Sequence, residues 1–250
     1  MKKRRIIICI AFVLIVAVVL GRMGYAYYGT APELSPYTCS QHKDDTLRIL
    51  FIGDSWAYMH QRHDAELAAM LSAKSSRPVS VCSYGICGIT SKGFYESLFQ
   101  DDSLRSLLSH GADYAIVSIG INDSYQKRGA THYALHTIYI LRFLIANNIH
   151  PILLEIPDYD IVYAYEHQTF SRKGLRQLSM LLTGSQIDCR EAYRQALRAQ
   201  LYQNQLLNKV RLLSLESWDY DLYLPDRMHL NEKGYATLDS MIAKSSFINF

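Results

Sequence analysis

Cysteine, proline and tryptophan are scarce in this 250-residue sequence, with 5, 6 and 2 copies respectively. So few cysteines exclude a small disulfide-rich scaffold, and 13 glycines with 6 prolines exclude a collagen-like or proline-rich chain. A large excess of one charge is also missing, since the formal net charge is only +3. The 49% hydrophobic and 20% charged residues are instead typical of a folded globular protein.

The small positive charge belongs to the N-terminus. Five basic residues precede the first acidic residue, Glu33, and they are Lys2, Lys3, Arg4, Arg5 and Arg22. The rest of the chain carries 21 basic and 23 acidic residues, a net charge of about −2. Because a nucleic-acid-binding surface needs clustered positive charge, binding to nucleic acid is not expected.

An unbroken apolar run from Ile6 to Leu20 follows the basic cluster. At about 1.5 Å per residue it is roughly 23 Å long, shorter than a hydrocarbon core of about 30 Å. Residues 1–22 are predicted to be an uncleaved signal anchor, which the length of the run favours, or a signal peptide cleaved after Ala26. The positive-inside rule then predicts a membrane-anchored protein with its main domain outside the cytoplasm, or a secreted or periplasmic protein after cleavage.

The remaining sequence reads as a linker followed by one domain. Residues 23–46 have no hydrophobic periodicity, and from residue 47 short apolar runs alternate with helical patterns. Strands are predicted at 47–52, 78–83, 114–119, 151–156 and 210–215. Helices are predicted at 57–73, 92–110, 131–147, 172–182, 188–206 and 231–244, the fifth opening on a capping box of Asp188 and Glu191. Strands apolar on both faces predict an α/β fold, with a parallel sheet covered on both sides, over residues 47–250.

Four cysteines, Cys39, Cys82, Cys87 and Cys189, lie beyond the apolar run. Disulfides persist in an exported domain, but four cysteines allow three pairings and the sequence does not select one. A local bridge between Cys82 and Cys87 and free thiols are both compatible with the sequence.

No pair of cysteines has the Cys-x-x-Cys spacing of a zinc site. His60 and His63 lie one helical turn apart near two acidic residues, and we interpret them as a solvated helix face. No metal site is therefore predicted.

In parallel sheets, ligands bind beyond the carboxyl ends of the strands, so the residues that follow each strand are informative. The first strand ends in Gly53-Asp54-Ser55, a turn that exposes a serine hydroxyl at the start of a helix, or simply a serine N-cap. The second leads into a glycine-bearing loop containing Gly88. The third ends near Asn122, whose amide can donate a hydrogen bond or form a capping Asx turn.

The loop before the last predicted helix contains Asp226 and His229, three residues apart. This spacing lets the carboxylate orient the imidazole while the second ring nitrogen faces outward, as in the base-and-orienter half of a catalytic triad. Each motif alone has a purely structural explanation. Their occurrence in order at successive strand ends favours a catalytic site.

With these motifs, the sequence from residue 47 to 250 resembles the SGNH (GDSL-type) hydrolase family. The resemblance rests on Gly53-Asp54-Ser55, on Gly88 in its Gly-x-Thr context, on Gly120-x-Asn122-Asp123 and on Asp226-x-x-His229. It implies a three-layer flavodoxin-like sandwich with strand order 2-1-3-4-5. It also implies Ser55 as nucleophile, His229 as base and Asp226 as its orienter, with an oxyanion hole formed by Ser55, Gly88 and Asn122. Trp56 and Arg227 depart from the family pattern, at positions where they can shape the mouth of the pocket.

These residues imply ester hydrolysis through an acyl-enzyme, with no metal or organic cofactor. The expected substrate is an acyl ester, with a preference for acetyl esters of a polysaccharide. Aromatic residues suited to stacking on sugar rings precede the helix at 172–182 and the last motif, and they include Tyr159, Tyr163, Tyr165, His167, Trp218, Tyr220 and Tyr223. Alternatives are an acyltransferase using the same acyl-enzyme and a non-catalytic glycan-binding or scaffold protein of the same fold.

Overall fold

The computed structural model describes residues 2–245, which fall into two compact units. The first unit ends at Pro32 and consists mainly of helix α1 (Lys2–Tyr28). Among the described residues, no helix has both the length and the apolar character that crossing a membrane requires. The second unit begins at Glu33 and contains the sheet described next.

A five-stranded sheet in the order β2-β1-β3-β4-β5 forms the centre of the second unit, and all neighbouring strands pair in parallel. The strands are β1 (Leu47–Gly53), β2 (Val79–Gly85), β3 (Tyr114–Ser118), β4 (His150–Leu154) and β5 (Arg211–Leu213). Phe51 and Ile116 are completely buried because helices cover both faces of the sheet. The predicted α/β fold and the strand order implied by the resemblance are confirmed.

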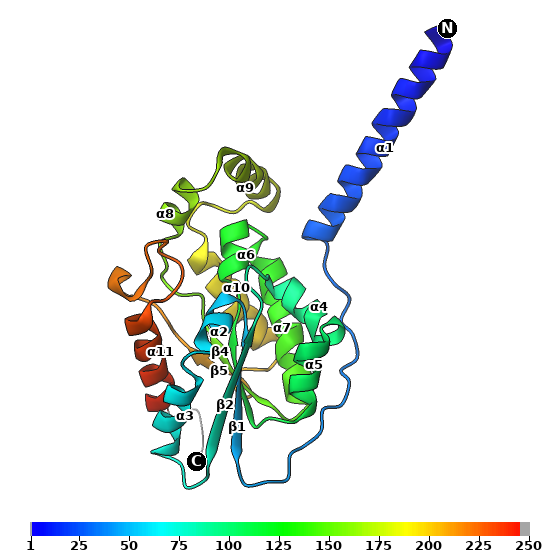
Figure 1. Ribbon diagram of the computed structural model, residues 1–250. Coiled ribbons are helices and arrows are strands. Elements are labelled where there is room, and N and C mark those ends of the chain that lie inside the picture. The colour runs from blue at the N-terminus through cyan, green and yellow to red at the C-terminus, as the bar shows by residue number, and fades with distance from the viewer. Residues whose placement is uncertain (1, 246–250) are drawn as a thin grey trace. The chain divides into compact units, whose positions relative to one another are not determined.

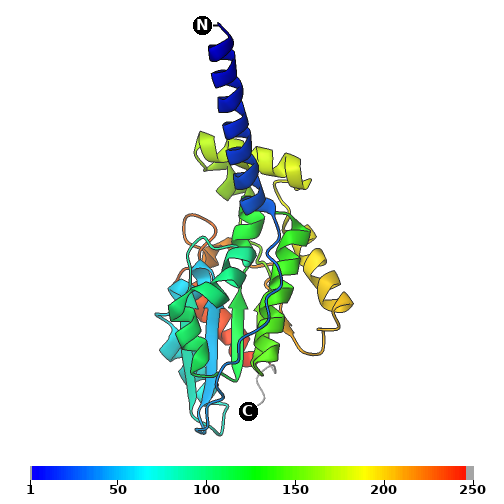
Figure 2. The same cartoon turned by 90° about the vertical axis from the view of Figure 1, so that its right-hand side faces the viewer.

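Helices cover the sheet in two layers, as Figures 1 and 2 show. One layer contains α2 (Ser55–His60), α3 (Asp64–Ser72) and α11 (Glu232–Lys244). The other contains α4 (Ser91–Gln100), α5 (Asp102–Ser109), α7 (Ala130–Ala146) and α10 (Arg190–Gln203). Three further helices lie beyond the carboxyl ends of the strands in both views, namely α6 (Ile121–Gln126), α8 (Ile161–Glu166) and α9 (Phe170–Thr183).

Two helices predicted as continuous are broken. The predicted helix 92–110 divides at Asp101, whose extended backbone ends α4 and whose carboxylate accepts the Leu104 N–H at 2.9 Å to begin α5. The predicted helix 57–73 divides into α2 and α3. Both breaks depend on the backbone conformation of a few residues, which the hydrophobic periodicity of the sequence does not reveal.

The predicted capping box at the start of α10 is wrong. Cys189, not Asp188, occupies the N-cap position, and its side chain makes no capping hydrogen bond. The Asp188 carboxylate instead pairs with the guanidinium of Arg190 at 2.7 Å. The Asp188 side chain therefore forms an ion pair with Arg190 instead of serving as the N-cap of α10.

The interpretation of His60 as part of a solvated helix face is wrong, because His60 is completely buried. Its Nε2 lies 2.8 Å from Asp239 of α11, and its Nδ1 lies 3.0 Å from Asp64 and 2.9 Å from the Ser83 hydroxyl. Burial alone lowers the pKa of His60, but the hydrogen bonds and charges of the two aspartates outweigh it and raise that pKa above its usual value. This network connects α2, α3, β2 and α11 inside the domain.

All five cysteines are free, so the bridge between Cys82 and Cys87 is not formed. Cys82 lies within β2, which continues to Gly85. The strand thus extends two residues past its predicted end at Ser83, and Cys82 lies inside it rather than beside the loop that contains Cys87.

The segment between Glu33 and β1 lacks secondary structure but packs on the domain. Cys39 is buried, and its N–H donates to the Asn147 side chain at 2.6 Å. His42 Nε2 lies 3.0 Å from the Asp113 carboxylate, which also accepts the Arg48 N–H at 2.8 Å. This part of the predicted linker is thus fixed to the domain.

Candidate active site

The parallel register aligns the strand ends that carry the predicted motifs. Gly53 at the end of β1 pairs with Gly85 of β2 and with Ser118 of β3, so the loops after these strands leave the sheet at one edge. Gly53 has φ +145°, and a Cβ atom there would lie 1.8 Å from the Ser118 carbonyl oxygen. Only glycine allows this close approach, which turns the chain sharply into α2.

Ser55, His229 and Asp226 form a continuous chain of hydrogen bonds. The Ser55 Oγ lies 3.0 Å from His229 Nε2, and His229 Nδ1 lies 2.6 Å from an Asp226 carboxylate oxygen. The other Asp226 oxygen accepts the backbone N–H groups of Met228 and His229 at 2.9 and 3.0 Å. The structure therefore brings together all three residues that the sequence analysis assigned to the triad.

Electrostatics keep the Asp226 carboxyl ionised. Partial burial acts to raise its pKa, but the hydrogen bond from the His229 side chain and those from the backbone N–H groups of His229 and Met228 outweigh burial. The pKa of Asp226 is consequently lower than its usual value. An ionised carboxylate beside Nδ1 holds the Nδ1 proton and leaves Nε2 available to accept one.

Gly88 and Asn122 line the same cleft as Ser55 and His229, and the volume of this cleft is about 600 Å³. Its other lining residues come mainly from the loop that carries Asp226 and from helix α8. Asn122 is buried, and its Nδ2 has no hydrogen-bond partner among the residues that the structure describes. Gly120, not an Asx turn of Asn122, occupies the N-cap of α6, so the Asn122 amide remains a donor next to the cleft.

Two buried aspartates support the loops around the cleft, and the sequence analysis assigned neither a role. Asp54, rather than Ser55, is the N-cap of α2, and its Oδ1 accepts the Trp56 N–H at 3.0 Å and the Ser118 hydroxyl at 3.1 Å. Asp123 accepts the N–H and the hydroxyl of Ser91 at 2.8 and 2.7 Å, which ties the Asn122 turn to the helix after the Gly88 loop. Desolvation raises the pKa of Asp54 to about 7 and that of Asp123 to about 6.

These raised pKa values predict that the fold loses stability as the pH rises from about 4 to 8. In this range the native protein binds more protons at Asp54, Asp123 and His60 than the unfolded chain does, so the free energy of unfolding falls with increasing pH. Urea denaturation at several pH values measures the slope. Asp54→Asn is expected to flatten it, whereas the control Asp102→Asn, at a 97% exposed side chain, leaves it unchanged. Equal slopes for the wild type and Asp54→Asn would show that Asp54 does not titrate in this range.

Trp56 and Arg227 do not shape the mouth of the cleft, contrary to expectation, since neither lines it. Trp56 is buried, and its indole N–H donates to the Met228 carbonyl at 3.0 Å. It thereby fastens the helix of Ser55 to the loop of His229. Arg227 adopts a left-handed conformation with φ +60° and places its guanidinium over the Tyr220 ring.

Only part of the predicted aromatic cluster reaches the cleft. Tyr163 and His167, both predicted, line it and stack on each other with ring centroids 3.8 Å apart. Tyr125, which the sequence analysis missed, lines it as well. The other five predicted aromatic residues do not line the cleft. Tyr159, Tyr165 and Tyr223 are buried in the domain, Tyr220 is exposed, and Trp218 stacks on Trp56.

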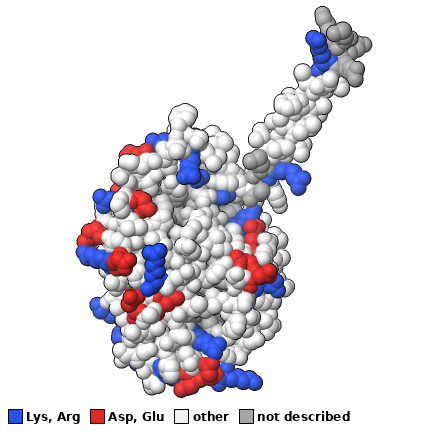
Figure 3. Space-filling view, in the orientation of Figure 1, with Lys and Arg blue, Asp and Glu red and all other residues white. Residues whose placement is uncertain are grey.

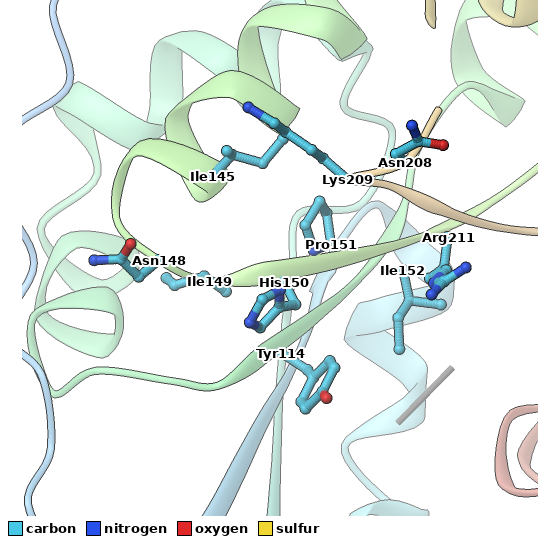
Figure 4. Close-up of a pocket in the computed structure, with 10 residues that line it drawn as sticks. All are labelled: Tyr114, Ile145, Asn148, Ile149, His150, Pro151, Ile152, Asn208, Lys209 and Arg211. Carbon is cyan, nitrogen blue, oxygen red and sulfur yellow. The ribbon is translucent and has the colours of Figure 1, made fainter. Parts of the chain in front are cut away.

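A second hollow of about 430 Å³ lies at the opposite, amino-terminal edge of the sheet (Figure 4). It is formed at the starts of β3, β4 and β5 by residues that include Tyr114, His150 and Arg211. Figure 4 shows the side chains of Lys209 and Arg211 pointing in different directions, without a common focus. This hollow lacks the hydrogen-bonded nucleophile and base of the first cleft, and we assign it no function.

Comparisons with known proteins agree with this geometry. A family model described as the GDSL-like lipase/acylhydrolase family matches residues 51–237, which include Ser55, Asn122 and His229. A comparison with curated proteins found no match.

Several solved structures share the fold. A lipase/acylhydrolase from Enterococcus faecalis is 14% identical, with a TM-score of 0.54 over 79% of this chain and 94% of that chain. A GDSL-like lipase from Bacteroides thetaiotaomicron is 15% identical, with a TM-score of 0.52 over 78% and 85%. An acetylxylan esterase from Geobacillus stearothermophilus is 13% identical, with a TM-score of 0.53 over 86% and 100%. The chain therefore belongs to the GDSL-like lipase/acylhydrolase family, the SGNH hydrolases, and is a carboxylic ester hydrolase.

Proposed function

We propose that this protein is an exported serine esterase whose nucleophile is Ser55. The observation that carries the proposal is the hydrogen-bonded chain from the Ser55 hydroxyl through His229 to Asp226. A serine hydroxyl at its ordinary pKa is a poor nucleophile, so His229 Nε2 accepts its proton while Ser55 Oγ attacks the ester carbonyl. Asp226 holds the imidazole in the required tautomer and stabilises the imidazolium that forms.

The negative charge that develops on the carbonyl oxygen needs donors already in place. In the proposed mechanism these are the Asn122 amide and the backbone N–H groups of Ser55 and Gly88, three residues that line one cleft. The unpartnered Asn122 Nδ2 supports this role, because a buried donor without a partner is costly unless a ligand satisfies it. His229 then protonates the leaving alcohol, and water, activated by His229, releases the acid from Ser55.

We propose an acetyl ester on a carbohydrate as the substrate. Support comes from the aromatic side chains of Tyr125, Tyr163 and His167 along the cleft, which suit stacking on sugar rings. The acetylxylan esterases among the solved structures of the same fold add support. Export is proposed from the sequence of the N-terminus, with its basic residues before the apolar run from Ile6 to Leu20.

A comparison of acyl lengths tests the substrate. The purified full chain is expected to release acetate from acetylated xylan and to hydrolyse p-nitrophenyl acetate faster than the octanoate, because aromatic side chains border a cleft of limited volume. Acetate release is measured by a coupled assay, and chemically deacetylated xylan serves as the control. Rapid octanoate hydrolysis without acetate release from xylan would contradict the carbohydrate assignment while leaving the serine mechanism intact.

A further inference from the structure

Helix α9 has its polar face inward and its apolar face outward, the reverse of a typical surface helix. Ser179 and Arg176 are buried against the domain, with Arg176 placed over the ring of Tyr125 in the cleft. On the other side, five large apolar residues are exposed, with exposed fractions from 46% to 93%: Phe170, Leu175, Leu178, Leu181 and Leu182.

These five side chains form one stripe. At 3.6 residues per turn they fall within an arc of about 140° around the helix axis. In Figure 3 the uppermost tip of the domain is uncharged, with Lys and Arg side chains close below it and acidic ones at its upper left. Exposing such a contiguous apolar stripe to water is unfavourable, so it indicates a surface that an apolar partner covers.

The charges around the stripe identify the kind of partner. Between Glu166 and Asp188 the sequence has three basic residues and no acidic one. Arg172 is exposed and Lys173 is half-buried on the polar side of α9. Apolar residues flanked by basic ones are typical of helices that lie in the surface of an anionic membrane. A second copy of the chain fits less well, because two α9 helices would bring like charges together without an acidic partner.

We propose that α9 docks on an anionic lipid surface, with its apolar stripe inserted at the boundary between head groups and acyl chains. The inner side of α9 contacts the cleft, because Arg176 lies over the ring of Tyr125, which lines it. Docking therefore places the cleft within roughly one helix diameter, about 10 Å, of the lipid. This inference concerns a surface of the domain and does not depend on the catalytic roles proposed above.

The test needs a probe on α9 itself, because the apolar run from Ile6 to Leu20 would also be expected to bring the full chain to lipid. We place a tryptophan in the stripe with Leu181→Trp and, as the matched control, on a distant exposed helix with Tyr202→Trp, at a side chain that is 74% exposed. Each full-length variant is mixed with vesicles of phosphatidylcholine and phosphatidylglycerol that contain brominated lipid. Hydrolysis of p-nitrophenyl acetate is expected to equal that of the wild type in both variants, which verifies the fold.

The brominated lipid is expected to quench Leu181→Trp at least about twofold more than Tyr202→Trp or the wild type, since an interfacial helix inserts roughly 5–10 Å. Quenching should weaken when phosphatidylglycerol is omitted. If the chain floats with the vesicles but Leu181→Trp is quenched no more than the control, α9 remains in water and the proposal is wrong. A spectral change that depends on protein concentration and not on lipid would assign the stripe to a second copy instead.

Discussion

Replacing Ser55 with alanine is expected to abolish ester hydrolysis while leaving the domain folded. The Ser55 hydroxyl is bonded to His229 Nε2 at 3.0 Å and lines the cleft. Alanine retains the backbone N–H and fits the first turn of α2, so only the hydroxyl proposed as the nucleophile is lost. We expect kcat to fall by at least about 1,000-fold, as for other enzymes that lose a triad nucleophile.

Ser118→Ala is the matched control. Its hydroxyl also bonds to an aspartate next to the site, Asp54 at 3.1 Å, but it does not line the cleft. This variant is expected to lose stability in urea denaturation and to keep its kcat. Turnover by Ser55→Ala at the wild-type rate would exclude Ser55 as the nucleophile.

Asp226→Asn is expected to lower kcat by about 10⁴-fold with little change in KM. The asparagine oxygen can still accept the backbone N–H groups of Met228 and His229, so the loop conformation is retained. Its amide group, however, can only donate to His229 Nδ1. The imidazole proton then moves to Nε2, which can no longer accept the proton of Ser55.

Asp221→Asn is the control for this variant. Asp221 is an exposed aspartate in the segment before the same loop, and its carboxylate pairs with Lys233 at the surface. Because exposed ion pairs contribute little, this variant is expected to keep wild-type kinetics. Equal losses in the two variants would mean that charge near the loop, rather than the tautomer of His229, limits turnover.

The candidate site residues were predictable because each lies in a short motif. Ser55, Gly88 and Asn122 follow β1, β2 and β3, and the register of these strands brings their ends to one edge of the sheet. Asp226 and His229 lie three residues apart in the loop before α11 and bond to each other. The apolar runs also predicted where the strands occur, although β5 is only three residues long. As an edge strand it pairs with β4 alone, and hydrophobicity does not show how far such pairing extends.

Features that depend on contacts between distant residues were not predictable. His60 looked like part of a solvated helix because its aspartate partner, Asp239, lies 179 positions later in the chain. Trp56 looked like a minor departure at the cleft mouth because its acceptor, the Met228 carbonyl, lies 172 positions away. The inverted orientation of α9 was hidden for a related reason, since periodicity identifies an apolar stripe but not the side on which the domain lies.

The bonds that connect α2 to the end of the chain also bear on when the proposed catalytic site can form during synthesis. Ser55 bonds to His229, Trp56 to Met228 and His60 to Asp239, so every one of these contacts joins the first part of the domain to its last forty residues. During synthesis Ser55 emerges long before Asp226 and His229, and translation is slow compared with local folding. With the roles proposed above, the growing polypeptide carries an unactivated serine until residues 226–229 have been made and have folded against α2. A chain truncated before Asp226 is therefore expected to be inactive rather than a partly active esterase.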